Sequence, residues 1–332
     1  MRKRNFLVII LALALTLMCT SLGLAKAKVV IKAGHAVPES HTLHYGWVVF
    51  KELIEKQSNG EIEVVIYSNA QLGGDRELIE STQHGNVSAA IASISPLTPF
   101  NKDFSVFEML FLFDSVEEAR TALDSKLGKH LLDSCQRINI KALEYMEVGF
   151  RDVSNSKHPV ISPDDLKSLK MRTMESPIQL MAWKLIGTNP TPIAFSELFT
   201  ALQQKTIDGQ ENPLELTYAM KFHELQKYFT LTHHLYGASV VMFNLDFWND
   251  LSEAHQKLIT SCMREAVLKQ RDLAYKKSLE AVQLFRDYGN EITELTPEQR
   301  QAFIDKVAPA FAEVEKQVSP EVFRMAKEVL KR

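Results

Sequence analysis

The feature that most constrains the fold is an alternation of strand-like and helix-like segments along most of the chain. Short β-branched or apolar runs at 28–34, 61–68, 87–95 and 138–150 are separated by segments with the apolar spacing of amphipathic helices. A similar order returns between residues 165 and 236. Strands that alternate with helices form α/β layers, in which ligands bind at the carboxyl ends of strands.

The length of the chain predicts two lobes. Its 332 residues exceed the usual size of one hydrophobic core. A helical pattern from Ser252 to about Tyr288 would be roughly 55 Å long, which is enough to cross both lobes. We therefore expect a two-lobed α/β fold with a ligand cleft between the lobes and a long bridging helix. The expected division is 28–149 with 238–277 for lobe I and 150–237 with 278–332 for lobe II.

Capping residues place several helix ends. Ser176 is the expected N-cap of a helix that has Pro177 at its first position and ends at Gly187. Asp75 and Ser196 are predicted as N-caps in the same way. Residues 228–236 and 238–245 each have the composition of a strand, and we predict two strands there.

The N-terminus has the layout of a secretory signal peptide. Arg2, Lys3 and Arg4 precede an apolar run over residues 6–17, and the small residue Ala27 offers a cleavage site. Residues 1–27 are therefore predicted to be a cleaved signal peptide. A retained membrane anchor is the alternative, but the apolar run is short for a span. We expect a freely soluble, exported protein in the periplasm.

Charge and cysteine content narrow the partners. Residues 1–27 hold four basic residues and no acidic one, so their removal takes the formal net charge from −3 to −7. This acidic balance disfavours nucleic acid and anionic membranes as partners, and we expect a monomer. The mature chain keeps Cys135 and Cys262, which we expect to be two separate buried thiols.

Enzyme and metal motifs are missing from the sequence. It contains no G-x-S-x-G, no Walker loop, no H-E-x-x-H and no G-x-G-x-x-G. The adjacent His233 and His234 would point to opposite faces of a strand, whereas a zinc site needs several converging ligands. We expect no metal, no cofactor and no catalytic residues.

Arg172, in "KMRTMESP", is the most informative polar residue. A guanidinium at a strand end needs a partner, and its planar fork matches a carboxylate. A structural salt bridge with Glu175 or Glu147 is the competing explanation, and Arg151 has the same two interpretations. Asn212 would serve a ligand or only the turn before Pro213.

At this point the residues resemble a known family. The segments "NAQLGGDRELIE", "EMLFLFD", "RDVSNSKHPVISPDDLKSLKMRT", "GTNPTPIAFSELFTALQQKTIDGQENP" and "KYFTLTHHLY" are similar to the periplasmic solute-binding subunits of tripartite ATP-independent periplasmic (TRAP) transporters. The similarity covers nearly the whole mature chain; Met109 stands where the family often has proline. It implies the periplasmic binding protein fold, with the two lobes and the bridging helix.

The resemblance also implies roles for single residues. Arg172 would clamp the ligand carboxylate, Arg151 would add a second cationic contact and Asn212 would bind the same carboxylate. Phe195, otherwise a hydrophobic staple for its helix, and Asp75 match cleft positions, and Ser93 lies where ligand-specific side chains occur. Further polar candidates for ligand hydroxyls are His35, Glu39, Glu175 and Tyr236.

The expected function is a receptor that delivers a small organic acid to TRAP membrane subunits. The segments "RTMESPIQLMAWK" and "LTHHLY" look more like members that take sugar acids than like those limited to C4-dicarboxylates. A dicarboxylate would call for a second cation, from Arg151 or Arg76, and stays the alternative. A periplasmic enzyme or a ligand-sensing protein are less favoured classes, since no catalytic set is visible.

Overall fold

The computed structural model describes residues 29–330, so the predicted signal peptide at 1–27 lies outside the described residues. Its strands are β1 Val29–Gly34, β2 Ile62–Tyr67, β3 Ala89–Ser93, β4 Ile140–Asn155, β5 Lys170–Thr173, β6 Asn189–Pro192, β7 Gly209–Asn212, β8 Tyr228–Asn244 and β9 Glu291–Glu294. Its helices are α2 Thr42–Gln57, α3 Asp75–Gln83, α4 Ile94–Leu97, α5 Val116–Asp124, α6 Lys126–Ser134, α7 Pro177–Ile186, α8 Leu198–Gln203, α9 Leu214–Ala219, α10 Leu245–Asn249, α11 Glu253–Tyr288, α12 Pro297–Gln317 and α13 Pro320–Leu330.

One mixed sheet runs through the described chain. Its strand order is β2-β1-β3-β8-β4-β7-β5-β6, and β9 pairs with β8. The β1–β2, β1–β3, β5–β6, β5–β7 and β8–β9 pairs are parallel, whereas β3–β8, β4–β8 and β4–β7 are antiparallel. The sheet therefore has two parallel ends joined by the long antiparallel pair β4–β8.

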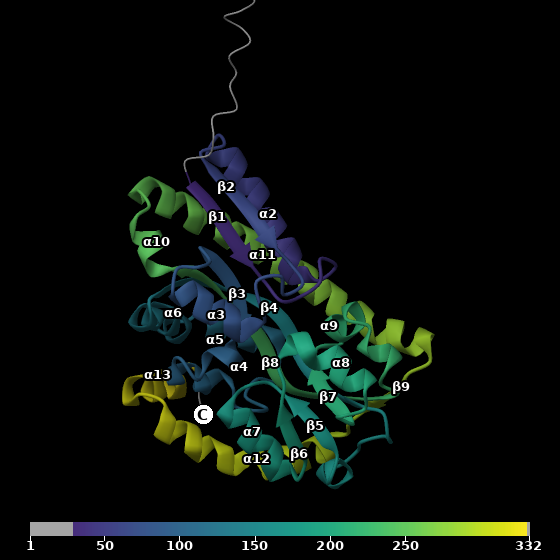
Figure 1. Cartoon of the computed structure of the whole chain (residues 1–332). Helices are drawn as coiled ribbons and strands as arrows, with labels where there is room; N and C mark the ends of the chain where they lie inside the picture. The colour runs from purple at the N-terminus through teal and green to yellow at the C-terminus, as the bar shows by residue number, and fades with distance from the viewer. Residues whose placement is uncertain (1–28, 331–332) are drawn as a thin grey trace, which may run out of the picture.

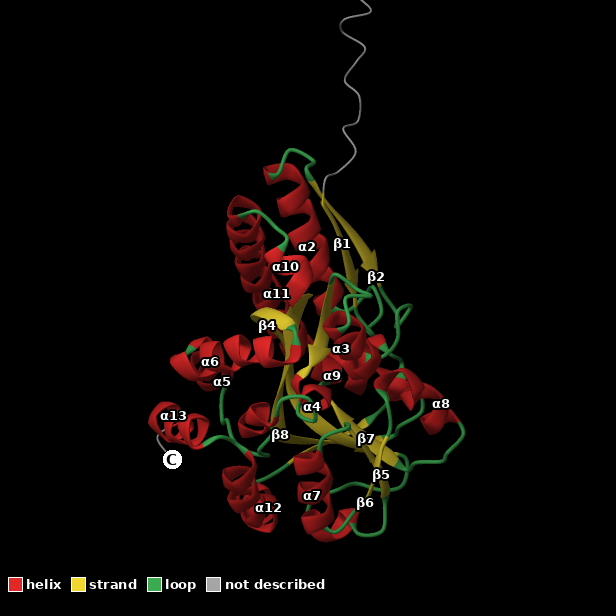
Figure 2. Ribbon diagram, turned by 60° about the vertical axis from the view of Figure 1, so that its left-hand side comes forward, coloured by secondary structure: helices red, strands yellow, loops and turns green. Residues whose placement is uncertain are grey.

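These two ends are the centres of two lobes (Figure 1). Lobe I is built on β1–β3 with helices α2–α6, and lobe II on β5–β7 with α7–α9 and α12. Figure 2 shows β4 and β8 passing from one lobe into the other. The two-lobed α/β prediction is confirmed.

The predicted strands at 228–236 and 238–245 are one continuous strand, and this prediction was wrong in detail. Gly237 does not break β8, because it pairs with Gly149 of β4 and the ladder continues on both sides. A register shift in β4 lies between Glu147 and Gly149, and Gly149 has φ +104°. The strand pair is thus irregular where it passes between the lobes.

The predicted helix caps are partly correct. Ser176 caps α7, Pro177 begins it and Gly187 ends it in the left-handed conformation. Asp75 is not an N-cap: Gly74 holds that position and Asp75 is the first helical residue. Ser196 lies inside a 3-10 helix, Phe195–Glu197, that leads into α8, so its predicted capping role was also wrong.

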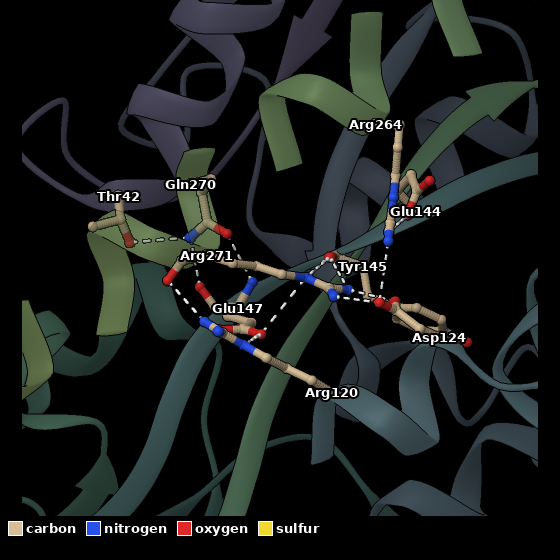
Figure 3. A network of polar contacts seen from close by, with 9 residues as sticks. All are labelled: Thr42, Arg120, Asp124, Glu144, Tyr145, Glu147, Arg264, Gln270 and Arg271. Atoms are coloured by element: carbon tan, nitrogen blue, oxygen red, sulfur yellow. Dashed lines mark hydrogen bonds and ion pairs between the residues drawn. The ribbon is translucent and has the colours of Figure 1, made fainter. Parts of the chain in front are cut away.

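The long helix α11 was predicted correctly, and its first half is fixed to lobe I. Arg264 and Arg271 both pair with Asp124 of α5, at 3.2 and 2.9 Å. The Gln270 side chain bonds both backbone groups of Glu147 in β4. Figure 3 shows this network, in which Arg120 also holds the Glu147 carboxylate. Through its first half, α11 is therefore part of lobe I.

The hydrophobic core lies on both faces of the sheet in each lobe. Trp47 of α2 is fully buried under α11, and Trp183 of α7 is buried in lobe II.

Cys135 and Cys262 are buried and unbonded, in different clusters of the core. The last helix, α13, packs on α6 of lobe I. No helix within 29–330 is long and apolar enough to cross a membrane.

Candidate functional site

Residues of both lobes enclose a small cavity beside the β4–β8 crossing. Its volume is about 40 Å³, which is room for a few waters. Its walls consist of His35, Ala36, Val37, Leu43, Asp75, Ile91, Ala92, Ser93, Pro96, Val148, Arg151, Arg172, Met174, Glu175, Phe195, Asn212, Leu216 and Ser239. The lobes also contact each other directly, because Nε2 of Gln179 on α7 donates to the Ser95 hydroxyl at 3.2 Å and to Glu108 at 2.9 Å, so the structure is in a closed form.

Arg172 lies on β5 and is 2% exposed. Its Nε donates to the carbonyl oxygen of Ile193 at 2.9 Å, which fixes the direction of the fork. Its Nη1 is buried without a hydrogen-bond partner among the described residues, and Arg172 forms no ion pair within this part of the chain. Burial is the main reason that its pKa falls to about 10, so the side chain stays charged at neutral pH. An unpaired buried cation is costly, and a ligand carboxylate would relieve that cost.

Arg151 lies on β4 and is already paired. Its Nη2 donates to Oε1 of Glu211 at 2.9 Å, and its Nε reaches the other oxygen of the same carboxylate. Nε2 of His234 lies 3.1 Å from Oε2 of Glu211, the oxygen that Nε of Arg151 also reaches. Burial alone would raise the pKa of Glu211, but Arg151 and His234 outweigh it and lower the value to about 2. The charge of Arg151 is therefore largely neutralised within the protein.

Asn212 reaches the cavity from β7, in register with Asp152 of β4. Its amide nitrogen donates to Oε1 of Gln210 at 2.5 Å, which leaves its carbonyl oxygen and the second amide hydrogen for other partners. Phe195, in the 3-10 helix before α8, forms an apolar part of the wall and packs edge-on against Phe222.

Lobe I contributes acceptors and a neutral histidine. Oδ2 of Asp75 accepts from the backbone nitrogen of Ser93 at 3.0 Å, and burial raises the pKa of Asp75. His35 follows β1, and its Nε2 lies 3.0 Å from Nδ1 of His44. Burial, His44 and His41 lower the pKa of His35 to about 3, so its ring is neutral at physiological pH.

Eight of the predicted residues thus meet at one cavity, and two do not. Glu39 is exposed and accepts a hydrogen bond from the Ser68 hydroxyl at 3.0 Å. Tyr236 packs against Phe150 and lines a groove on the other side of the β4–β8 pair. The reason is strand alternation, because Tyr236 and the cavity-lining Ser239 are three positions apart on β8 and face opposite sides.

Ser239 and Glu211 were missed. The Ser239 hydroxyl is buried at the cavity without a hydrogen-bond partner among the described residues. A serine within the apolar run "ASVVMFNL" is the signal that could have found it. Glu211 lies between Gln210 and Asn212, and its carboxylate determines how the Arg151 side chain is held. Residues 29–330 contain no group of three His, Cys, Asp or Glu side chains placed to hold a metal ion.

Known proteins share this architecture. Residues 33–317 match the model of bacterial extracellular solute-binding protein family 7. The chain is 31% identical over 275 residues to the 2,3-diketo-L-gulonate-binding periplasmic protein YiaO of Escherichia coli (strain K12), covering 83% of both chains. It superposes with a TM-score of 0.89 on the sugar acid binding protein DctPAm of Advenella mimigardefordensis in complex with galactonate, at 31% identity and 92% and 98% coverage of the two chains.

A TRAP periplasmic solute-binding protein of Sulfurospirillum deleyianum with bound succinate is equally similar. Its TM-score is 0.87 at 30% identity, and the alignment covers 91% of this chain and 99% of that one. Family, fold and cavity therefore agree. The chain belongs to bacterial extracellular solute-binding protein family 7 and is a solute receptor of the TRAP transporter type.

Proposed function

We propose that this receptor binds a sugar acid, such as an aldonate or a uronate, and delivers it to the membrane subunits of a TRAP transporter. The observation that carries the proposal is Arg172, a buried charged fork with an unpaired Nη1 at the wall of a cavity closed by both lobes. A carboxylate that binds this fork bidentately would replace the water that solvates it when the lobes are open. Asn212 and Arg151 are proposed as further contacts of the same carboxylate.

The remaining polar groups favour a ligand with several hydroxyls. Asp75 and Glu175 line the cavity, and carboxylates accept hydrogen bonds from hydroxyl groups but repel a second carboxylate. His35 is neutral and cannot act as a second cation. Together with Ser93 and the missed Ser239, these side chains form a surface suited to a polyol chain. The relative bound to galactonate supports the same ligand class.

A C4-dicarboxylate is the second candidate. The specific observation in its favour is the guanidinium of Arg151 at the cavity wall, and a similar protein is bound to succinate. This cation already shares the Glu211 carboxylate through two hydrogen bonds. Its attraction for a second ligand carboxylate is correspondingly weaker, and we rank this candidate below a sugar acid.

A thermal-shift screen followed by calorimetry tests the ligand class. The panel would contain galactonate, galacturonate, erythronate and succinate. A ligand at a hundred times its Kd stabilises the folded state by about 2.7 kcal/mol, which gives a clear rise in Tm. We expect a sugar acid to produce the largest shift. A shift with succinate alone would reject the sugar-acid proposal in favour of the dicarboxylate.

Three further proposals concern the state of the protein. We propose that it releases its ligand chemically unchanged, which recovery of the acid after prolonged incubation tests. We propose that it is a monomer without affinity for nucleic acid, which light scattering with and without DNA tests. We also propose that the signal peptide ends at Ala27. N-terminal sequencing of the exported protein should then begin at Lys28.

The proposed hinge lies at the glycine pair of the long strands. Gly149 and Gly237 face each other in the β4–β8 ladder next to a register shift. Both positions coincide with the boundaries proposed for the lobes, 149/150 and 237/238. Small residues at an irregular point of the ladder provide a place where backbone dihedrals can change as the lobes close.

A further inference from the structure

A close contact between a histidine and a glutamate joins the two lobes outside the ligand cavity. Nε2 of His41 lies 2.8 Å from Oε2 of Glu215, and the side chains are 0% and 10% exposed. His41 precedes α2 of lobe I, whereas Glu215 lies on α9, which follows β7 of lobe II. The contact therefore brings together elements that separate when the cleft opens.

The geometry fixes the tautomer of His41. The backbone nitrogen of Leu43 donates to Nδ1 of His41 at 3.2 Å, so Nδ1 is an acceptor and carries no proton. A neutral ring then has its proton on Nε2, the atom closest to Glu215, although the angle at Nε2 is not that of a hydrogen bond. Serine, threonine, asparagine or aspartate would be the usual choice for the N-cap of α2. A histidine has the additional property that its second nitrogen can reach the other lobe.

Lys277 of α11 completes the cluster. Its Nζ lies 3.6 Å from Oε1 of Glu215 and donates to the carbonyl oxygen of Ser40 at 3.1 Å. Burial alone would raise the pKa of Glu215, but His41 and Lys277 outweigh it and lower that pKa. Glu215 thus contacts His41 of lobe I and Lys277 in the second half of α11, and Lys277 is itself bonded to Ser40 of lobe I.

The cluster lies next to the cavity without forming part of its wall. Leu43 and Leu216 line the cavity, and each is one or two positions from a member of the cluster. His41, Glu215 and Lys277 are not among the lining residues. A change in these three side chains would therefore alter closure without removing a ligand contact.

We propose that His41, Glu215 and Lys277 form a closure latch. The latch exists only in the closed form and shifts the open–closed equilibrium independently of the ligand. The apparent affinity of a receptor that binds in its closed form increases with the population of that form. The latch rests on the proposed function in one respect, since it assumes that the lobes close around an acid. It holds the receptor closed after binding and mainly determines how slowly the ligand leaves.

Two substitutions distinguish the effect of the closure latch from the effect of His41 as the N-cap of α2. Glu215→Ala removes the carboxylate, and His41→Asn keeps an N-cap side chain that is too short to reach lobe II. Glu224→Ala is the matched control, because it removes an exposed carboxylate close to the end of the same helix. Labels on Lys56→Cys of α2 and Lys184→Cys of α7, both exposed, report the distance between the lobes. Galactonate is the first probe, followed by the other acids of the panel.

We expect Glu215→Ala to raise the dissociation rate about fivefold to a hundredfold, the usual range of coupling between two states. The association rate should change by less than about threefold, since encounter involves the open form. His41→Asn should have a similar effect. The double variant should release the ligand no faster than Glu215→Ala alone, because both substitutions remove the same contact. Lys277→Met should have a smaller effect, and Glu224→Ala none. Ligand-free Tm values, measured for each variant, identify any that fail to fold.

The outcomes distinguish the latch from the ligand proposal. Wild-type affinity and dissociation rate in both Glu215→Ala and His41→Asn would overturn the latch while leaving the sugar-acid proposal intact. Fully additive effects in the double variant would also overturn it. If no acid of the panel closes the wild-type protein, the ligand class is rejected. The latch is then measured in the ligand-free protein, where Glu215→Ala must reduce the closed subpopulation, and an unchanged distance distribution contradicts it.

Discussion

Nη2 of Arg151 lies 2.9 Å from Oε1 of Glu211; both side chains are buried, and Arg151 lines the cavity. The two guanidiniums of the site are thus not equivalent. Arg151 has a carboxylate from the protein itself, whereas Arg172 has none among the described residues. This difference leaves one full positive charge for the ligand and favours an acid with a single carboxylate.

Removing the charge of Glu211 should destabilise the fold. In Glu211→Gln the guanidinium of Arg151 stays buried without its counter-ion, which typically costs about 3 to 5 kcal/mol. Denaturant unfolding at pH 7 measures the loss. Glu224→Gln, an exposed carboxylate of the same lobe, should change the free energy of unfolding by less than about 0.5 kcal/mol. Equal stability of the two variants would contradict the importance of the buried pair.

Arg172→Ala should weaken ligand binding by roughly two to three and a half decades. The estimate follows from a cost of about 3 to 5 kcal/mol for leaving the partner carboxylate buried and unpaired, at 1.4 kcal/mol per tenfold. Arg172→Lys keeps the charge but loses the planar fork, and we expect it to be severely impaired as well. Calorimetry with the best acid of the panel measures both affinities. The ligand-free Tm should change little, because Arg172 forms no ion pair within residues 29–330.

The fold could be predicted from the sequence where one local signal dominated. Ser176, Pro177 and Gly187 mark both ends of α7 because cap chemistry depends on neighbouring residues only. The length of α11 followed from a long uninterrupted helical pattern with a serine at its start. By contrast, the continuity of β8 through Gly237 depends on its partner strand, which no local pattern reveals.

The site could be predicted in its residue types but not in its pairing. The residue pattern left Arg151 and Arg172 with the same two interpretations, and only the fold shows that Glu211 pairs with one of them. Tyr236, a predicted ligand residue, lies away from the cavity because the register of its strand decides which face it occupies. The contact of His41 with Glu215 joins positions far apart in the chain, so no spacing rule could have found it.

Gly149→Ala should impair both stability and ligand binding. With φ at +104°, a Cβ at this position costs about 1 to 2 kcal/mol through backbone strain. Gly289→Ala is a matched control, because Gly289 has φ +99° with nothing within 4 Å of an added Cβ, at the end of α11 and away from the proposed hinge. We expect both variants to lose similar stability in denaturant unfolding. Only Gly149→Ala should also change the ligand affinity, and a parallel loss in Gly289→Ala would argue against a hinge at Gly149.

Glu108 should make the stability of the protein depend on pH. This carboxyl is 3% exposed, and its Oε2 accepts from Nε2 of Gln179 at 2.9 Å, which joins α7 of lobe II to the segment after α4 of lobe I. Burial raises the pKa of Glu108 from 4.5 to about 6. Between these two pH values the folded state binds more protons than the unfolded state. The contribution of Glu108 to the free energy of unfolding therefore falls as the pH rises from about 4.5 to about 6, whereas His35, with a pKa lowered to about 3, contributes with the opposite sign.

The size of this change tests the assignment. A shift from 4.5 to about 6 corresponds to a loss of about 2 kcal/mol at 1.36 kcal/mol per pKa unit. Glu108→Gln has no proton to lose and can still accept from Gln179, so the stability of wild type relative to this variant should fall by that amount over the interval. Urea unfolding of both proteins at pH 4.5, 5.2, 6 and 7 gives the two profiles. Parallel profiles for wild type and Glu108→Gln would show that Glu108 does not cause the change, and a wild-type stability that rises with pH relative to the variant would reverse the sign argued for this carboxyl.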